Sequence, residues 1–127
     1  MTHLLFVTAD RSNFADFSSA IEKQGSTISW APSGSQALET IGQKTIDLVV
    51  TDETLGDMTG LEFVGRLVAV NPMVNCAAVS SLSEEDYHEA SEGLGILMQL
   101  PPNPDQAEGE RLMAHLNEII NLTPGTK

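Results

Sequence analysis

The fold is decided by the stretch Asp47-Leu-Val-Val-Thr-Asp52-Glu-Thr-Leu-Gly-Asp-Met-Thr-Gly60. A short apolar strand ends on the carboxylate of Asp52, and a glycine-containing loop then leads into an amphipathic helix that we expect to begin at Leu61. In an open parallel sheet, chemistry takes place beyond the carboxyl ends of the strands. We therefore expect Asp52 to be exposed and held by a rigid scaffold, where it can act as a nucleophile or a metal ligand.

The same alternation of apolar strand and amphipathic helix continues through the chain. We predict strands over residues 4–8, 27–30, 46–51, 76–80 and 96–100, separated by segments with helical spacing. Apolar residues that mark these helices are Phe14, Phe17, Ile21, Ala37, Leu38, Ile41, Leu61, Val64, Leu67, Leu112, Leu116, Ile119 and Ile120. Alternating strands and helices predict a parallel sheet covered on both faces. The expected fold is an α/β three-layer αβα sandwich of the flavodoxin-like (βα)5 type, with strand order 2-1-3-4-5.

Local signals mark where the helices begin. Ser33 and Ser35 precede the second helix, and Ser81-Leu-Ser-Glu84 is a candidate capping box for the fourth. The fourth helix is the weakest of the set, because only Tyr87 and Ala90 are available to line its inner face.

Composition limits the class of protein. A chain of 127 residues is long enough for one core, so we expect a single domain over residues 1–122 and a short tail over 123–127. Eighteen acidic against six basic residues give a net charge of −12, which argues against direct binding to nucleic acid or to anionic membranes. No apolar run approaches the roughly 20 residues of a membrane span. Without a leader-like segment, and with a lone Cys76 predicted to lie in the core, we expect a cytoplasmic protein.

Four positions suggest a family. Asp52 ends the third strand, Gly60 precedes the following helix, Ser80 ends the fourth strand, and Pro101 follows the fifth. Over nearly its whole length the chain resembles the receiver domains of two-component response regulators, and this resemblance implies a cis peptide bond before Pro101. The resemblance implies that Asp52 accepts a phosphoryl group from a histidine kinase, that Ser80 is the switch hydroxyl, and that Mg²⁺ is the cofactor.

Three other positions depart from the family pattern. The acidic pair expected after the first strand is replaced by Thr8-Ala9-Asp10, the lysine that ends the fifth strand by Leu100, and the aromatic reporter residue by Leu97. Asp52, Asp10 and the backbone carbonyl of Thr54 could then form only a weak Mg²⁺ site, because Mg²⁺ prefers several oxygen ligands in near-octahedral geometry. A further hypothesis pairs Arg11 with Asp52 in place of the metal or the lysine.

Two mechanisms and one other class of function stay open at this point. In the first mechanism Asp52 is phosphorylated; in the second, which we favour, the chain is an atypical or pseudo-receiver with a surface permanently in one state. Both act by binding a histidine kinase or another signalling protein, and not as an enzyme on a separate substrate. A homodimer is expected through the fourth helix, fifth strand and fifth helix, near Leu94, Ile96 and Met98. The alternative is a flavodoxin-like carrier of a flavin or a nucleotide.

Overall fold

The computed structural model describes residues 2–71, 74–94 and 96–122. The elements follow one another as β1 (His3–Val7), the 3₁₀ turn η1 (Arg11–Phe14), α1 (Ala15–Glu22), β2 (Thr27–Ala31), α2 (Gly34–Gln43), β3 (Leu48–Thr51), α3 (Gly60–Val70), β4 (Asn75–Val79), α4 (Glu84–Ala90), β5 (Ile96–Leu100) and α5 (Gln106–Leu122). Five strands and five α-helices are therefore present in the described part of the chain. The predicted alternation is confirmed, with strand ends displaced by no more than two residues.

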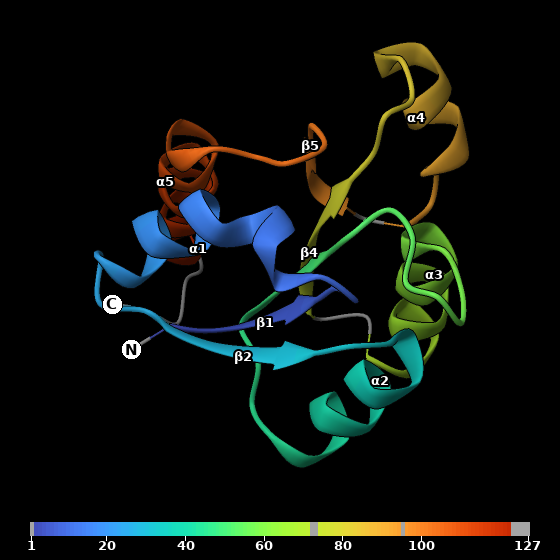
Figure 1. The fold of residues 1–127 in the computed structure, drawn as a ribbon, viewed down its shortest axis with the longest axis horizontal. Coiled ribbons are helices and arrows are strands. Elements are labelled where there is room, and N and C mark those ends of the chain that lie inside the picture. The colour runs from blue at the N-terminus through green and yellow to red at the C-terminus, as the bar shows by residue number, and fades with distance from the viewer. Residues whose placement is uncertain (1, 72–73, 95, 123–127) are drawn as a thin grey trace.

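The strands form one sheet in the order β2-β1-β3-β4-β5, and all four pairings are parallel. This is the predicted 2-1-3-4-5 order. Figure 1 shows α1 and α5 side by side on one face of the sheet, and α2 and α3 on the other. The fold is thus the three-layer sandwich expected from the sequence.

Alternate residues of β1 supply both halves of the core. Leu4 and Phe6 pack on the face covered by α1 and α5, whereas Leu5 and Val7 pack on the face covered by α2 and α3. All four side chains are completely buried. A strand buried on both faces has a continuous apolar sequence, which explains the uninterrupted run in β1.

Within the described residues, helix α4 has fewer buried residues than any other α-helix. Among its residues, all of which are described, only Tyr87 is buried, and Ala90 is exposed, so the prediction that Ala90 lines the inner face is wrong. The predicted capping box Ser81–Glu84 is also wrong, because Ser83 caps the helix by accepting the backbone N–H of Asp86. Ser33 does cap α2, as predicted. A complete capping box occurs instead at α3, between Thr59 and Glu62.

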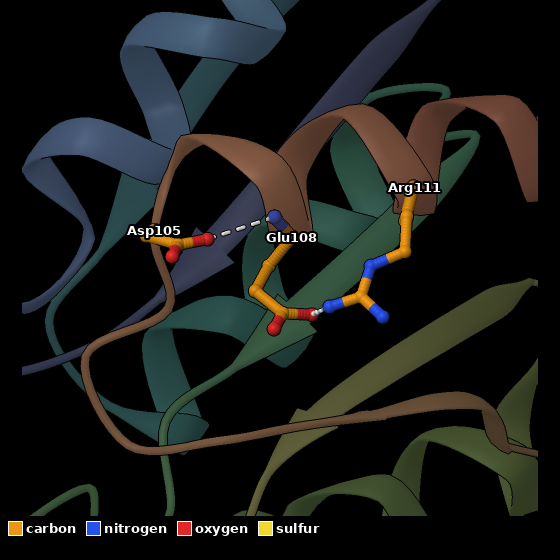
Figure 2. Close-up of polar contacts among 3 residues, drawn as sticks. All are labelled: Asp105, Glu108 and Arg111. Carbon is orange, nitrogen blue, oxygen red and sulfur yellow. Dashed lines mark hydrogen bonds and ion pairs between the residues drawn. The ribbon is translucent and has the colours of Figure 1, made fainter.

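Helix α5 begins with a polar network that the sequence analysis did not identify. The Asp105 carboxylate accepts the Glu108 backbone N–H, and the Glu108 side chain pairs with Arg111 one turn later (Figure 2).

The segment before this helix contains Pro101, whose preceding peptide bond is trans, so the expected cis bond is wrong. The side chains of Ile119 and Ile120, and the tail over 123–127, lie outside the described residues.

Strand β5 forms one edge of the sheet and is irregular. Cys76 pairs with Ile96, but the next residue, Ala77, pairs with Met98, so Leu97 is an extra residue in the ladder. Such a bulge bends the strand and interrupts pairing. Leu94 and Ile96 pack partly against one core face and Leu97 and Met98 partly against the other.

None of the helices in the described ranges is long and apolar enough to cross a membrane.

Candidate functional site

Asp52 lies where the sequence predicts it, directly after β3 at the carboxyl-terminal rim of the sheet. β3 is the central strand, between β1 and β4. The backbone N–H of Asp52 continues the β1–β3 ladder by donating to the Val7 carbonyl oxygen at 2.9 Å. The strand scaffold therefore holds the backbone of Asp52, and its half-buried side chain lies at the rim.

The Asp52 carboxylate is held by neutral donors. Its Oδ2 accepts the Thr8 hydroxyl at 2.8 Å and the Asn13 side-chain amide at 2.9 Å. Its Oδ1 accepts the backbone N–H of Glu53 at 2.8 Å. Thr8 follows β1 and Asn13 lies in the 3₁₀ turn η1, so the two side-chain donors come from the segment after the neighbouring strand β1. Hydrogen bonds to the charged form of a carboxylate stabilise its negative charge.

Gly60 permits the close approach of α3 to this site. A Cβ at residue 60 would overlap the carbonyl oxygen of Asp52 and approach the Thr51 side-chain oxygen to 3.2 Å. The Gly60 backbone N–H also donates to the Glu53 carbonyl at 2.9 Å. The glycine is therefore needed to place the first turn of α3 directly against the backbone of Asp52.

The Asp10 side chain caps η1. Its Oδ1 accepts the Ser12 hydroxyl at 2.6 Å and the Ser12 backbone N–H at 3.0 Å. The Ser12 hydroxyl, followed by its backbone N–H, lowers the pKa of the fully exposed Asp10 carboxyl below its usual range.

The donor set does not fit a tightly held Mg²⁺. Within the described ranges, no group of three or more His, Cys, Asp or Glu side chains is placed to hold a metal ion. Asp52 brings one carboxylate, already engaged by Thr8 and Asn13. Thr54 is exposed, and its backbone forms an isolated bridge to Thr59. Mg²⁺ is held in proteins by one or two carboxylates together with waters and substrate phosphates. Thr8 and Ala9 bring no carboxylate where the resemblance implies an acidic pair.

The two residues at the ends of β4 and β5 differ in character. Ser80 follows β4, is 4% exposed, and its hydroxyl accepts the Leu82 backbone N–H at 3.1 Å. Leu100 ends β5 and is completely buried among apolar side chains from α1 and α5. The position where the resemblance calls for a lysine is thus part of the hydrophobic core.

Arg11 does not pair with Asp52. Its guanidinium lies 5.1 Å from the centre of the Trp30 ring, in a cation–π contact on the β2 side of the rim. The hypothesis that Arg11 replaces the metal or the lysine is therefore wrong.

Sequence reasoning missed two further carboxylate contacts of the loop between β3 and α3. Glu53 Oε2 accepts both the backbone N–H and the hydroxyl of Ser81, each at 2.9 Å. Asp57 accepts the backbone N–H groups of Gly34 and Ser35 at 3.1 Å, at the start of α2. The pKa of Asp57 is lowered first by the Gly34 N–H and then by the Ser35 N–H. Three carboxylates of one loop thus accept donors from three different neighbouring segments.

A pocket of about 300 Å³ lies next to Glu53. Its lining is mainly apolar and comes from the β3–α3 loop, the first turn of α3 and the end of β4: Glu53, Thr54, Thr59, Leu61, Val79, Ser80 and Leu82. The β3–α3 and β4–α4 connections therefore face each other across this pocket.

Known proteins show the same organisation. Residues 4–103 match the response regulator receiver domain family. The chain is 28% identical over 132 residues to the transcriptional regulatory protein ZraR of Escherichia coli K12, covering 98% of this chain and 30% of that protein. It is 32% identical over 97 residues to the uncharacterized transcriptional regulatory protein YesN of Bacillus subtilis, covering 75% of this chain and 25% of that protein. The chain therefore spans less than a third of these curated relatives.

Solved structures agree at the level of the fold. A two-component response regulator from Clostridium difficile superimposes with a TM-score of 0.81 at 18% identity, covering 98% of this chain and 99% of that one. The chemotaxis response regulator CheY4 of Vibrio cholerae superimposes with a TM-score of 0.80 at 17% identity, covering 91% of this chain and 98% of that one. The match to the family extends from the second residue of β1 to beyond the end of β5 and includes all the rim residues described above. The chain therefore belongs to the response regulator receiver domain family of two-component signalling.

Proposed function

We propose that this chain is an atypical receiver domain that signals through protein–protein contacts, with phosphorylation of Asp52 and binding of Mg²⁺ both impaired. The observation that carries the proposal is the environment of Asp52. Its carboxylate is engaged by the Thr8 hydroxyl, the Asn13 amide and the Glu53 backbone N–H. One of these neutral donors, Thr8, stands where the family pattern has an acidic residue.

The electrostatics of the rim support the proposal. A phosphoryl group on Asp52 would add negative charge to a loop that already carries Glu53 and Asp57, in a chain of net charge −12. Receivers offset that charge with a divalent cation and a lysine. Here the lysine position is the buried Leu100. Each missing charge-assisted contact is worth about 1.5–3 kcal/mol, so the combined loss would lower phosphorylation efficiency by orders of magnitude.

The roles of the individual site residues are part of the proposal. Asp52 is the phosphoacceptor position and Ser80 the switch hydroxyl, and a weak Mg²⁺ site would use Asp52, Asp10 and the Thr54 carbonyl. Ser12 engages only Oδ1 of the Asp10 carboxylate, so Asp10 would join that site through its other oxygen, Oδ2. We infer no chemistry on a separate substrate: the one group transfer open to the chain is the receipt of a phosphoryl group from a histidine kinase.

The proposed partners follow from the family. Receiver domains interact with kinases and other signalling proteins, and we infer a histidine kinase or another signalling protein here. The contact surface would be α4, β5 and α5, which also offers a route to a homodimer through the half-buried Ile96 and Met98. The acidic charge of the chain opposes direct contact with nucleic acid and with anionic membranes. A flavin or nucleotide carrier would need a phosphate-binding loop after β1. Asp10 is an exposed anion in that loop and repels phosphate, which argues against such a carrier.

A titration with beryllofluoride and Mg²⁺, followed by amide NMR, tests the proposal. We expect no saturable shift at the amides of Asp52, Ser80 or their neighbours at millimolar metal. The Asp52→Asn variant is the matched control, because it removes the acceptor while keeping the shape of the side chain. Saturable shifts in the wild-type chain that disappear in Asp52→Asn would overturn the proposal and restore phosphorylation as the mechanism.

A further inference from the structure

The Glu53–Ser81 contact links the loop that carries the acceptor position to the loop that leads into α4. Glu53 directly follows Asp52, and Ser81 directly follows Ser80. One carboxylate oxygen, Oε2, accepts both hydrogen bonds, from the Ser81 backbone N–H and from its hydroxyl. Hydrogen bonds to a charged acceptor are about twice as strong as neutral ones. This contact therefore spans the rim next to Asp52 without using Asp52 itself.

The rest of the β4–α4 loop is fixed by two further hydrogen bonds. The Leu82 backbone N–H donates to the Ser80 hydroxyl oxygen at 3.1 Å, and the Leu82 carbonyl accepts the Gln99 side-chain amide of β5 at 3.2 Å. Ser83 then caps α4. Glu53 thus holds the beginning of a short segment whose end is the first turn of α4.

Helix α4 has little else to hold it in place. It has seven residues, and Tyr87 is its one buried side chain. The Tyr87 hydroxyl is buried and has no hydrogen-bond partner among the described residues. In Figure 1 the helix stands at the periphery of the molecule, beyond the end of β4. The position of such a helix depends on the loop that precedes it.

We propose that Glu53 is a resident latch: a built-in carboxylate that holds the β4–α4 loop through both donors of Ser81, and so sets the position of α4 without any group added to Asp52. This inference rests on the proposed function, in which α4 presents a surface to a partner in one permanent state. An anion added to Asp52 would need donors from the facing loop. Those of Ser81 are already engaged, and the Glu53 charge repels a second anion beside it.

The chain contains one tyrosine, Tyr87, which gives the latch a specific probe. In protein labelled with 3-fluorotyrosine, a single ¹⁹F signal reports on α4, and amide exchange measured by NMR reports on Ser81. We expect Glu53→Ala to increase the exchange rate of the Ser81 amide about tenfold, since a charge-assisted hydrogen bond is lost, and to shift or broaden the Tyr87 signal. Glu53→Gln, which keeps an acceptor and loses the charge, should give smaller changes in the same direction.

Asp57→Ala is the matched control. It removes a carboxylate of the same loop whose donors lie on α2, so the signals of Ser81 and Tyr87 should stay as in the wild type. Ser81→Ala provides a second perturbation, because it deletes the hydroxyl donor and leaves Glu53 intact; it should also shift the Tyr87 signal.

Unchanged Ser81 exchange and an unchanged Tyr87 signal in Glu53→Ala would overturn the latch. Equal effects from Asp57→Ala would overturn it too, since they would indicate a general loosening of the loop. All these measurements are made without metal or phosphoryl analogue. A wild-type chain that binds beryllofluoride would therefore contradict the proposed function separately, whatever the latch variants show.

Discussion

The α-carbon of Gly60 lies so close to the carbonyl oxygen of Asp52 that no side chain can stand between them. This contact joins the first turn of α3 to the end of β3. A capping box between Thr59 and Glu62 fixes the same turn from the solvent side. The position of Asp52 at the rim therefore depends on a glycine eight residues later in the chain as well as on the strand that precedes it.

Gly60→Ala should destabilise the fold by about 1–3 kcal/mol, because the added methyl group would force the α3 turn or the Asp52 backbone to move. Urea denaturation measures the change. Gly42→Ala is the matched control, since a Cβ at residue 42 in α2 meets nothing within 4 Å. That substitution should leave the stability unchanged or raise it by about 0.5–1 kcal/mol, as alanine is the better helix former. Equal free energies of unfolding for the two variants would contradict this account of Gly60.

Restoring the acidic pair should create a metal-dependent chain. Thr8 is 3% exposed and donates to Asp52, so Thr8→Asp combined with Ala9→Asp would crowd three carboxylates at the rim and lower the melting temperature without metal. Mg²⁺ at a concentration of about a hundred times its dissociation constant should then increase the free energy of unfolding of the double variant by about 2.7 kcal/mol. The wild-type melting temperature should change little over the same range. A double variant that does not respond to Mg²⁺ would show that more than the acidic pair is missing.

Acid should weaken the contact between Asp57 and α2. Backbone N–H groups of Gly34 and Ser35 lower the Asp57 pKa in the folded state below its ordinary value of 3.8. The resulting stabilisation is fully present above that ordinary value and is lost as the pH falls through the folded-state pKa. The difference in melting temperature between wild type and Asp57→Asn should therefore be largest at neutral pH and should shrink on acidification. Glu39→Gln, on the exposed side of α2, serves as the control for loss of one negative charge.

Tyr87→Phe should raise the free energy of unfolding by about 1 kcal/mol, because it keeps the ring and removes a buried hydroxyl that has no hydrogen-bond partner in the described part of the chain. Burial, with a smaller contribution from the nearby Cys76 thiol, raises the pKa of Tyr87 to about 12. Tyr87→Ala should instead cost about 3 kcal/mol, since the ring is lost. Chemical denaturation monitored by Trp30 fluorescence measures both. A destabilised Tyr87→Phe would indicate that the hydroxyl has a partner in solution.

The sheet was predictable because its signals are local. Uninterrupted apolar runs such as Leu4–Val7, separated by helical spacing, are enough to predict parallel strands, and Asp52 followed its strand as expected. Short-range polar contacts were harder to place. The box predicted at Ser81 and Glu84 has the right residues, but Ser83 is nearer to the first turn and caps the helix instead.

Contacts between distant residues at the rim were beyond the sequence analysis. Asn13 and Asp52 are 39 positions apart, and their hydrogen bond appears only once β1 and β3 are neighbours. Glu53 and Ser81 are 28 positions apart, and their hydrogen bonds form only once β3 and β4 are neighbours. Arg11 was the nearest cation in the sequence to the expected site, yet the Trp30 ring of β2 lies within its reach and takes the contact. The charge of Arg11 could not identify its contact, because the chain has 18 acidic residues for six basic ones.

The extra residue in β5 has a consequence for how copies of this chain can meet. A regular outer strand leaves a ladder of free backbone groups that can recruit a further strand, which is a route to fibres. The insertion of Leu97 breaks the regular spacing of the strand near its beginning. Addition of a strand from another copy of the chain to β5 is therefore disfavoured. Association of two copies at this edge of the sheet has to use contacts between side chains, which are selective.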